Sequence, residues 1–458
     1  MVRQLCSPLL HVSRFAVSGI LPVCTGLDDG GRVIMGTGPV DEITELVQHI
    51  VERAQSAARQ LAKLPSGVKN DALMRMAATL EAEEAALTAL NARDVERARD
   101  HGLSSAMVDR LGLTPQRISD MVRGLREIAA LSDPIGEVTH MWRRPNGLEI
   151  GMMRIPLGVI AFIYESRPNV TADAAGLCLK SGNAVILRGG SEAIQSNLAL
   201  SELLSKAAAA AGIPDDALQM IPITDRRAIF ELLKRDKHVD LVVARGGEEF
   251  IRTVVEHSRI PVIKHDKGLC HTYIDADADL AMAAVVAFNA KVQRPSVCNA
   301  METLLVHRDV ALSFLPLYCD QLKAAGVEVR GCPETLRIVP WALAASEEDW
   351  DTEYLDLILS VKVVGSLDDA LEHIARHSSK LSESIITTNY QKARRFLNEV
   401  DSAAVFVNAS TRFTDGHEFG FGAELGISTQ KLHARGPMGL ESLTSLKYIV
   451  YGDGQVRG

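Results

Sequence analysis

The chain is poor in the features that mark several common classes of protein. Aromatic residues make up 5% of its 458 residues and the net charge is −9, so neither base-stacking platforms nor a basic surface for nucleic acid is expected. No apolar run is long enough to cross a membrane. The seven cysteines are scattered without a CxxC pair, which disfavours a disulfide framework or a zinc site and fits a reducing cytoplasm. We therefore expect a globular protein whose partners are small molecules, not nucleic acid or membrane.

The usual glycine fingerprint of dinucleotide-binding proteins is missing as well. No GxGxxG follows a strand-like run. Arg188-Gly189-Gly190-Ser191-Glu192, which comes directly after an apolar run, is the alternative. Arg188 could pair with a 2′-phosphate, and the hydroxyl and the carboxylate could hold a ribose. Taken alone, the pattern is more typical of a strand-to-helix turn capped by a serine.

The length of the chain suggests two or three domains. Residues 1–34 differ from the rest, and we expect a disordered extension there, or a start site placed too early before Met35. Apolar residues at helical spacing predict an amphipathic helix over 41–63, and further helices follow to about residue 131. Thr114-Pro115 predicts an N-cap followed by proline at the first helical position.

Two strand-like runs, Val138–Arg143 and Leu148–Ile155, flank Asn146-Gly147, which is a hairpin-turn signal. The run Leu446–Tyr451 could complete a small sheet with this hairpin. We expect docking on another subunit to cover the hairpin.

From residue 157 onward, short apolar strands alternate with helices, which predicts doubly wound parallel sheets. The expected strands are Gly158–Tyr164, Ala184–Leu187, Val239–Val243, Glu302–His307, Val361–Val364, Ser384–Thr388 and Ala403–Val407. Such sheets bind ligands beyond the carboxyl ends of their strands. Polar residues stand at these ends in Glu165–Asn169, Arg188–Glu192 and Arg245–Glu248.

Some of these strand-end residues have side chains suited to chemistry. Asn169 could donate to an oxyanion and Arg167 could hold an acidic substrate, although turn chemistry explains both residues more simply. Glu353 could accept from ribose hydroxyls. The histidines at His265, His271, His417 and His433 show no metal-ligand spacing, so no metal site is expected.

Cys298 lies in an irregular Pro/Ser segment between a helical pattern and an apolar strand-like run. A thiol at such a junction has a free side chain and nearby backbone N–H groups, as an acyl-transfer nucleophile requires. Most free cysteines are structural, so residue type alone does not decide the matter.

The segment Val292–Thr303 resembles the gamma-glutamyl phosphate reductase family of the aldehyde dehydrogenase superfamily. Further segments match this family in the right order and extend the resemblance from about Val40 to the C-terminus: Met107–Leu131, Pro156–Ile160, Tyr164–Val170, Gly182–Gly190, Thr352–Val364, Val407–Phe413 and Gly426–Pro437. The resemblance implies NADPH-dependent reduction of L-glutamate 5-phosphate to the 5-semialdehyde, the second step of proline synthesis. It also implies a homo-oligomer in the cytoplasm and functional coupling to glutamate 5-kinase.

The resemblance assigns the chain an aldehyde dehydrogenase-like α/β fold with two doubly wound domains. The NADP(H)-binding domain is expected at 35–137 and 157–271, the catalytic domain at 272–439, and the oligomerisation strands at 138–156 and 440–458. Cys298 takes the nucleophile's position and Asn169 that of an oxyanion donor. Expected cofactor contacts are Arg188, Gly189, Ser191, Glu192, Gly246, Gly247 and Glu353, and expected substrate contacts are Arg167, Arg294, Asn299 and Arg412.

One segment departs from the family pattern. Where the family usually carries a glycine and a histidine, this chain has Lys380 and Leu381. We expect this change to alter a turn or a contact while leaving Cys298 untouched. Two alternatives remain open: an acylating aldehyde dehydrogenase with another acyl donor, and a non-catalytic interaction protein of the same fold.

Overall fold

The computed structural model describes residues 41–264 and 267–457. The extension predicted at 1–34 and His265 lie outside the described residues. The chain separates into two compact units, residues 1–42 and 43–458, and the fold below is that of the second unit. Within the described residues no helix is long and apolar enough to cross a membrane.

Between residue 41, where the described part begins, and the first described strand lie five helices: α1 (Glu42–Leu61), α2 (Ser66–Ala82), α3 (Glu84–Asp100), α4 (Ser105–Leu111) and α5 (Pro115–Ala130). The prediction of a helix over 41–63 is confirmed by α1. The predicted cap is also confirmed, because the Thr114 hydroxyl accepts a hydrogen bond from the backbone N–H of Arg117 at 3.2 Å and Pro115 begins α5.

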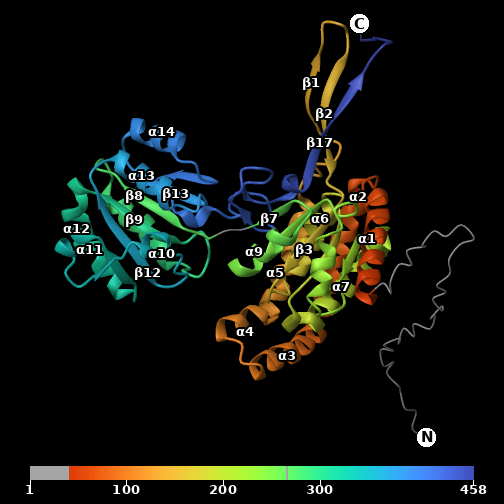
Figure 1. The fold of residues 1–458 in the computed structure, drawn as a ribbon, viewed down its shortest axis with the longest axis horizontal. Helices are drawn as coiled ribbons and strands as arrows, with labels where there is room; N and C mark the ends of the chain where they lie inside the picture. Colours follow the sequence, from red (N-terminus) through yellow and green to blue (C-terminus); the bar gives the residue numbers. More distant parts are fainter. Residues whose placement is uncertain (1–40, 265–266, 458) are drawn as a thin grey trace, which may run out of the picture. The chain divides into compact units, whose positions relative to one another are not determined.

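A five-stranded parallel sheet of order β5-β4-β3-β6-β7 forms the first α/β layer (Figure 1). Its strands are β3 (Val159–Tyr164), β4 (Ala184–Arg188), β5 (Leu218–Met220), β6 (Leu241–Arg245) and β7 (Val262–Lys264), and the helices among them are α6 (Val170–Lys180), α7 (Ile194–Ala209), α8 (Arg227–Leu232) and α9 (Glu248–His257). The three predicted strands are confirmed. The edge strands β5 and β7 escaped prediction because three residues are too few to establish a period.

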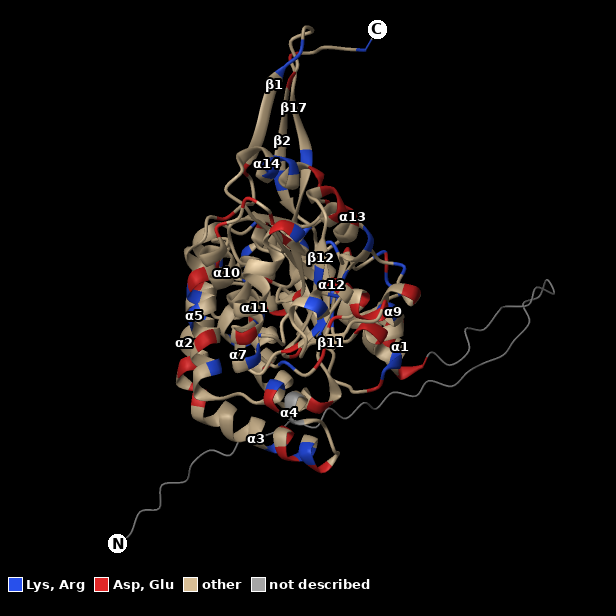
Figure 2. Cartoon of the chain, turned by 90° about the vertical axis from the view of Figure 1, so that its left-hand side faces the viewer, with Lys and Arg blue, Asp and Glu red and all other residues tan. Residues whose placement is uncertain are grey.

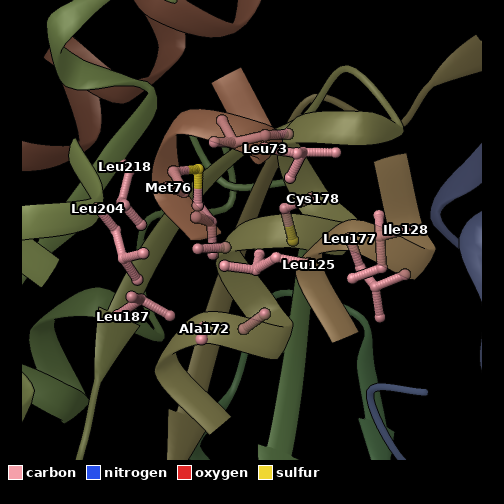
Figure 3. Close-up of a cluster of buried hydrophobic side chains, with 14 of the residues drawn as sticks. Leu73, Met76, Leu125, Ile128, Ala172, Leu177, Cys178, Leu187, Leu204 and Leu218 are labelled. Atoms are coloured by element: carbon pink, nitrogen blue, oxygen red, sulfur yellow. The ribbon is translucent and has the colours of Figure 1, made fainter. Parts of the chain in front are cut away.

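Side chains alternate along β3 and so build a core on each face of this sheet. Val159, Ala161 and Ile163 pack with α1, α8 and α9. The intervening residues Ile160 and Phe162 pack with α2, α5, α6 and α7. Figure 3 shows part of this second core, in which Leu125 and Cys178 lie among other buried apolar side chains. Helices on both faces explain why the strands are apolar throughout.

A seven-stranded sheet of order β11-β10-β12-β9-β8-β13-β14 forms the second α/β layer. Its strands are β8 (Cys270–Ile274), β9 (Met301–His307), β10 (Glu328–Gly331), β11 (Leu343–Ala344), β12 (Ile358–Val364), β13 (Ser382–Ile386) and β14 (Ala404–Val407), and its helices are α10 (Leu280–Val292), α11 (Arg308–Ala324), α12 (Pro333–Ile338), α13 (Leu367–His377) and α14 (Tyr390–Glu399). All six pairings are parallel. One face packs against α10 and α11 and the other against α13 and α14. The predicted doubly wound α/β fold is confirmed.

A separate three-stranded antiparallel sheet joins β1 (Val138–Arg143), β2 (Glu149–Pro156) and β17 (Thr444–Tyr451), as Figure 1 shows. The predicted hairpin and its third strand are confirmed. Large apolar and aromatic side chains remain exposed on this sheet, among them Met141, Tyr448 and Val450. A two-residue pair, β15 (Ile427–Ser428) with β16 (Gly436–Pro437), lies in the glycine-rich tail.

Charged residues of both signs occur along the elements seen in Figure 2. In the view of Figure 2, acidic and basic positions alternate along the helices, and the described residues form no broad basic face in that view.

Candidate active site

Cys298 stands in the irregular segment between α10 and β9, at the amino end of a central strand. Its side chain is half-buried and packs against an apolar cluster of Cys270, Leu381 and Ile427. On its open side lies a cavity of about 1470 Å³, which Cys298 lines. The thiol is therefore held by packing on one side and open to a ligand on the other.

The backbone of Cys298 is fixed from behind by residues 268–270. The Cys270 thiol donates to the Cys298 carbonyl oxygen at 3.3 Å. A Cβ atom placed on Gly268 would lie 2.0 Å from the same oxygen, so only glycine fits there. Gly268 in turn donates its N–H to the Glu353 carboxylate at 2.9 Å. This short segment thus connects Cys298 to Glu353, two residues that lie 55 positions apart in sequence.

Asn299 fixes the other side of the nucleophile segment. Its side-chain amide donates to the Thr414 carbonyl at 2.9 Å, and its backbone carbonyl accepts from the Thr411 hydroxyl at 2.8 Å. These bonds hold the 411–414 turn, which carries Arg412, beside Cys298. The Asn299 Oδ1 atom is buried without a partner within the described structure, so one acceptor is left over for a ligand.

A buried ion pair that was not predicted supports the same region. Lys291 donates to Glu302 with 2.6 Å between Nζ and Oε2, and both side chains are almost fully buried. Burial raises the pKa of Glu302 to about 7, against the opposing effect of Lys291. Glu302 also accepts from the backbone of Leu355, which follows Glu353. Two features of the sequence could have predicted this ion pair: a lysine late in an apolar helix and a glutamate inside an apolar strand.

Burial raises the pKa of the Cys298 thiol to about 12. The positive charge of Arg245 opposes this effect, whereas Glu424 and Glu353 reinforce it. In the protein without ligands the thiol is therefore protonated at neutral pH. Reaction requires the proton to leave as the sulfur bonds to carbon.

Arginines surround the Cys298 cavity. Arg110, Arg167, Arg245, Arg294 and Arg412 all line it. Burial, together with the charges of the nearby Arg245 and Arg110, lowers the pKa of Arg167 to about 10. Within the described residues, the side chains of Arg110, Arg167 and Arg294 form no hydrogen bond or ion pair. Carboxylates such as Glu353 and Glu424 line the cavity as well. These three guanidinium groups are nevertheless available to pair with an anionic ligand.

The predicted cofactor residues fall into two groups. Gly246, Gly247 and Glu353 line the Cys298 cavity, and Gly247 is the N-cap of α9. The N–H of Gly247 donates to Glu165 Oε2 at 2.8 Å, and a Cβ on Gly246 would lie 2.5 Å from that same oxygen. A larger residue at Gly246 would therefore have to displace the Glu165 carboxylate and the Phe250 ring.

Arg188, Gly189, Ser191 and Glu192 stand at the end of β4 and do not line that cavity. Arg188 donates to the carbonyls of Gly189 at 2.7 Å and Thr224 at 3.0 Å, while its Nε is buried without a partner in the described structure. Glu192 accepts from the Ser166 N–H at 2.7 Å. A free buried donor beside the strand ends and a glycine-bounded helix N-terminus together suit a dinucleotide.

Asn169 begins α6 and lines a smaller neighbouring cavity instead of the Cys298 cavity. Its assignment as oxyanion donor stays a prediction. Ser166 does line the Cys298 cavity, with φ at +37° in the left-handed region. The sequence pattern places Ser166 at a strand end but gives no signal that distinguishes it as a functional residue.

Lys380 and Leu381 are closer to the nucleophile than expected. Lys380 has φ at +63°, a conformation that favours glycine. Leu381 is fully buried in the apolar cluster that packs against Cys298. Leu381 therefore belongs to the packing surface of the thiol, and the expectation that the departure leaves Cys298 untouched stays a prediction.

The three described histidines of the predicted non-metal set have other surroundings. His271 is buried against Glu383, with 3.1 Å between Nδ1 and Oε2, and His417 lines the smaller cavity. His433 lies in the tail with φ at +44°. In the described parts of the chain, no three His, Cys, Asp or Glu side chains cluster as metal ligands would.

Comparisons with known proteins agree with this geometry. Residues 39–335 match the model of the aldehyde dehydrogenase family. The chain is 62% identical to the gamma-glutamyl phosphate reductase of Moorella thermoacetica, over 90% of this chain and 98% of that one, and 56% identical to that of Syntrophomonas wolfei, over 89% and 97%. The crystal structure of gamma-glutamyl phosphate reductase from Thermotoga maritima superposes with a TM-score of 0.88 at 45% identity, covering 90% of this chain and 100% of that chain.

Proposed function

Because the chain belongs to the aldehyde dehydrogenase family, whose members use a nicotinamide cofactor, and within it to the gamma-glutamyl phosphate reductases, we propose that it reduces L-glutamate 5-phosphate to L-glutamate 5-semialdehyde with NADPH. Phosphate is released, and the reaction is the second step of proline synthesis. The observation that carries this proposal is the half-buried thiol of Cys298 in a cavity lined by Arg167, Arg294 and Arg412, which form no ion pair within the described residues.

The protonated state of Cys298 suits an acyl phosphate. The sulfur bonds to the acyl carbon, the carbon–oxygen bond to phosphate breaks, and the thiol proton leaves with the phosphate. No separate acid is needed, because phosphate is already a good leaving group. Arg294 and Arg412 are the cations we assign to the phosphate, since both line the cavity at Cys298.

The oxyanion that forms during attack needs donors near the sulfur. The backbone N–H of Cys298 lies close enough to its own sulfur to lower the thiol pKa, so we assign it as one donor. Ser166 is a candidate for the second donor, alongside Asn169. Packing by Leu381 and Cys270 shields the thioester from water on its buried side.

The cofactor residues proposed here hold NADP(H) at the carboxyl ends of β3, β4 and β6. The nicotinamide, when bound, supplies the hydride that reduces the acyl group. Gly246 and Gly247 allow close approach at α9, and Glu353 is the candidate for ribose hydroxyls. Arg188 fixes the Gly189 turn through its two backbone bonds. Burial lowers the pKa of Arg188, and the charge of Arg226 adds to this effect, so Arg226 lies near Arg188. Arg226 is exposed and forms no ion pair in the described structure. Its cation therefore suits the 2′-phosphate.

Assembly follows from the three-stranded sheet. Its exposed Met141, Tyr448 and Val450 suit burial against a second copy, so we propose a homo-oligomer joined through β1, β2 and β17. Functional coupling to glutamate 5-kinase and a cytoplasmic location remain predictions from the sequence.

The direct test is oxidation of glutamate 5-semialdehyde with NADP⁺, measured with phosphate, with arsenate or with coenzyme A as acyl acceptor. The proposal requires dependence on phosphate or arsenate; dependence on coenzyme A would favour the related acylating enzymes instead. Cys298→Ser should abolish turnover while NADPH binding persists, and Cys319→Ser, a buried thiol in α11, is the matched control. Growth of a proline auxotroph lacking this step tests substrate and activity together, and failure of the wild-type chain there would favour a non-catalytic role.

A further inference from the structure

A second cavity of about 450 Å³ adjoins the Cys298 cavity and extends between α5 and α6. The two cavities share Arg167, Arg245, Arg294 and Glu424 as lining residues. The two cavities therefore meet at these side chains.

Asp173, in the first turn of α6, lines only the second cavity. Its carboxylate makes no hydrogen bond or ion pair within the described residues. Gly124 on α5 faces it without a side chain, and a Cβ there would lie 3.8 Å from Asp173 Oδ1. The charges of Arg245 and His417 act on this carboxylate without bonding to it, so its oxygens remain open to a donor in the cavity.

The remaining lining residues carry charges of both signs. Arg110 and Arg167 line the cavity with no anionic partner in the described structure, and the Asn169 amide stands beside them. Glu424 lies opposite and accepts from the Gly416 N–H at 2.9 Å. A simple anion would use the arginines and leave Asp173 unpaired. A group that carries an ammonium and a carboxylate on one carbon would satisfy both.

We propose that the second cavity binds the α-amino acid end of the substrate, with Asp173 receiving the ammonium group and Arg167 the carboxylate, while the acyl phosphate faces Cys298. The inference rests on the proposed function and names its specificity-determining residues. The charge of Arg245 acts on both the Cys298 thiol and the Asp173 carboxylate, so one guanidinium lies near each. Because Cys298 and Asp173 both lie near Arg245, the short chain of a glutamyl substrate suits the space between them.

The test compares two aldehydes in the phosphate-dependent oxidation with NADP⁺: glutamate 5-semialdehyde and 5-oxopentanoate, which lacks the amino group. The wild type should prefer the first. Asp173→Asn should lower kcat/KM for glutamate semialdehyde by about tenfold or more, the scale of a lost charge-assisted hydrogen bond, and leave 5-oxopentanoate nearly unchanged. Asp173→Glu, which retains the charge, should retain the preference.

Asp71→Asn is the matched control, because Asp71 lies on α2, lines neither cavity, and pairs with Arg75 at 2.7 Å. It should leave the preference intact. Thermal unfolding of Asp173→Asn without ligand gives a second readout, and its midpoint should rise because an unpaired carboxylate has been removed.

Equal losses of Asp173→Asn activity toward both aldehydes, or no loss toward either, would overturn the assignment of Asp173. A wild-type protein that oxidises neither aldehyde with phosphate would overturn the proposed function, and the subsite with it. The two failures are therefore distinguishable in one set of assays.

Discussion

Gly268 lies directly against the backbone of Cys298. A Cβ atom on Gly268 would stand 2.0 Å from the Cys298 carbonyl oxygen and 2.6 Å from its Cα. The contact is made by backbone on both sides, so no flexible side chain can move away to make room. The position of the nucleophile therefore depends on a glycine that lies 30 residues before it in sequence.

Gly268→Ala should lower kcat by about 100-fold, because the added methyl must displace the backbone that carries the thiol. Steady-state oxidation of glutamate semialdehyde measures this loss. Gly67→Ala is the control, since Gly67 lies in α2 and a Cβ added to it would meet no atom within 4 Å, so activity should be unchanged. Wild-type kcat in Gly268→Ala would contradict the proposed dependence.

Alkylation of Cys298 in the ligand-free protein should be slow at neutral pH and should accelerate as pH rises toward 12. Burial raises the pKa of this thiol to about 12, so the reactive thiolate is scarce below that pH. Labelling with iodoacetamide at a series of pH values, followed by mass spectrometry of the Cys298 peptide, measures the profile. A rate at pH 7 above that of an ordinary exposed thiol would show that the thiolate is already formed.

Arg226→Ala should weaken NADPH binding by about tenfold while sparing NADH, since Arg226 is exposed and its cation is free to pair with the 2′-phosphate. Arg188→Ala should weaken both cofactors, because Arg188 holds the Gly189 and Thr224 carbonyls. Titration of each variant with NADPH and NADH separates the two roles. Arg188→Ala acting on NADPH alone would instead support a direct contact of Arg188 with the phosphate.

Lys380→Gly should stabilise the protein by about 1 kcal/mol, because φ at +63° strains a residue with a side chain. The lost ion pair is exposed, and Asp401 keeps Lys431 and Arg435 as partners. Unfolding in urea measures the change. Lys380→Ala keeps the strain while losing the charge, so a gain in Lys380→Ala equal to that in Lys380→Gly would contradict the explanation.

Much of the fold was predictable because its signals are local. Apolar periodicity marks α1, a hydroxyl before a proline marks the start of α5, and Asn146-Gly147 marks the hairpin. The strands β5 and β7 were missed because they are too short for a period, and a parallel partner far along the chain stabilises each one.

In the candidate site, too, local features were predictable from the sequence and contacts between distant segments were not. The sequence by itself determined the nucleophile segment around Cys298, the arginines near it and the family, because these depend on residue type and order. Only the tertiary structure decided that Gly268 supports Cys298, that Leu381 packs against the thiol, and that Asp173 and Arg167 line one cavity. These relations join segments from separate strands and helices, and distance and burial between them arise only when the chain packs.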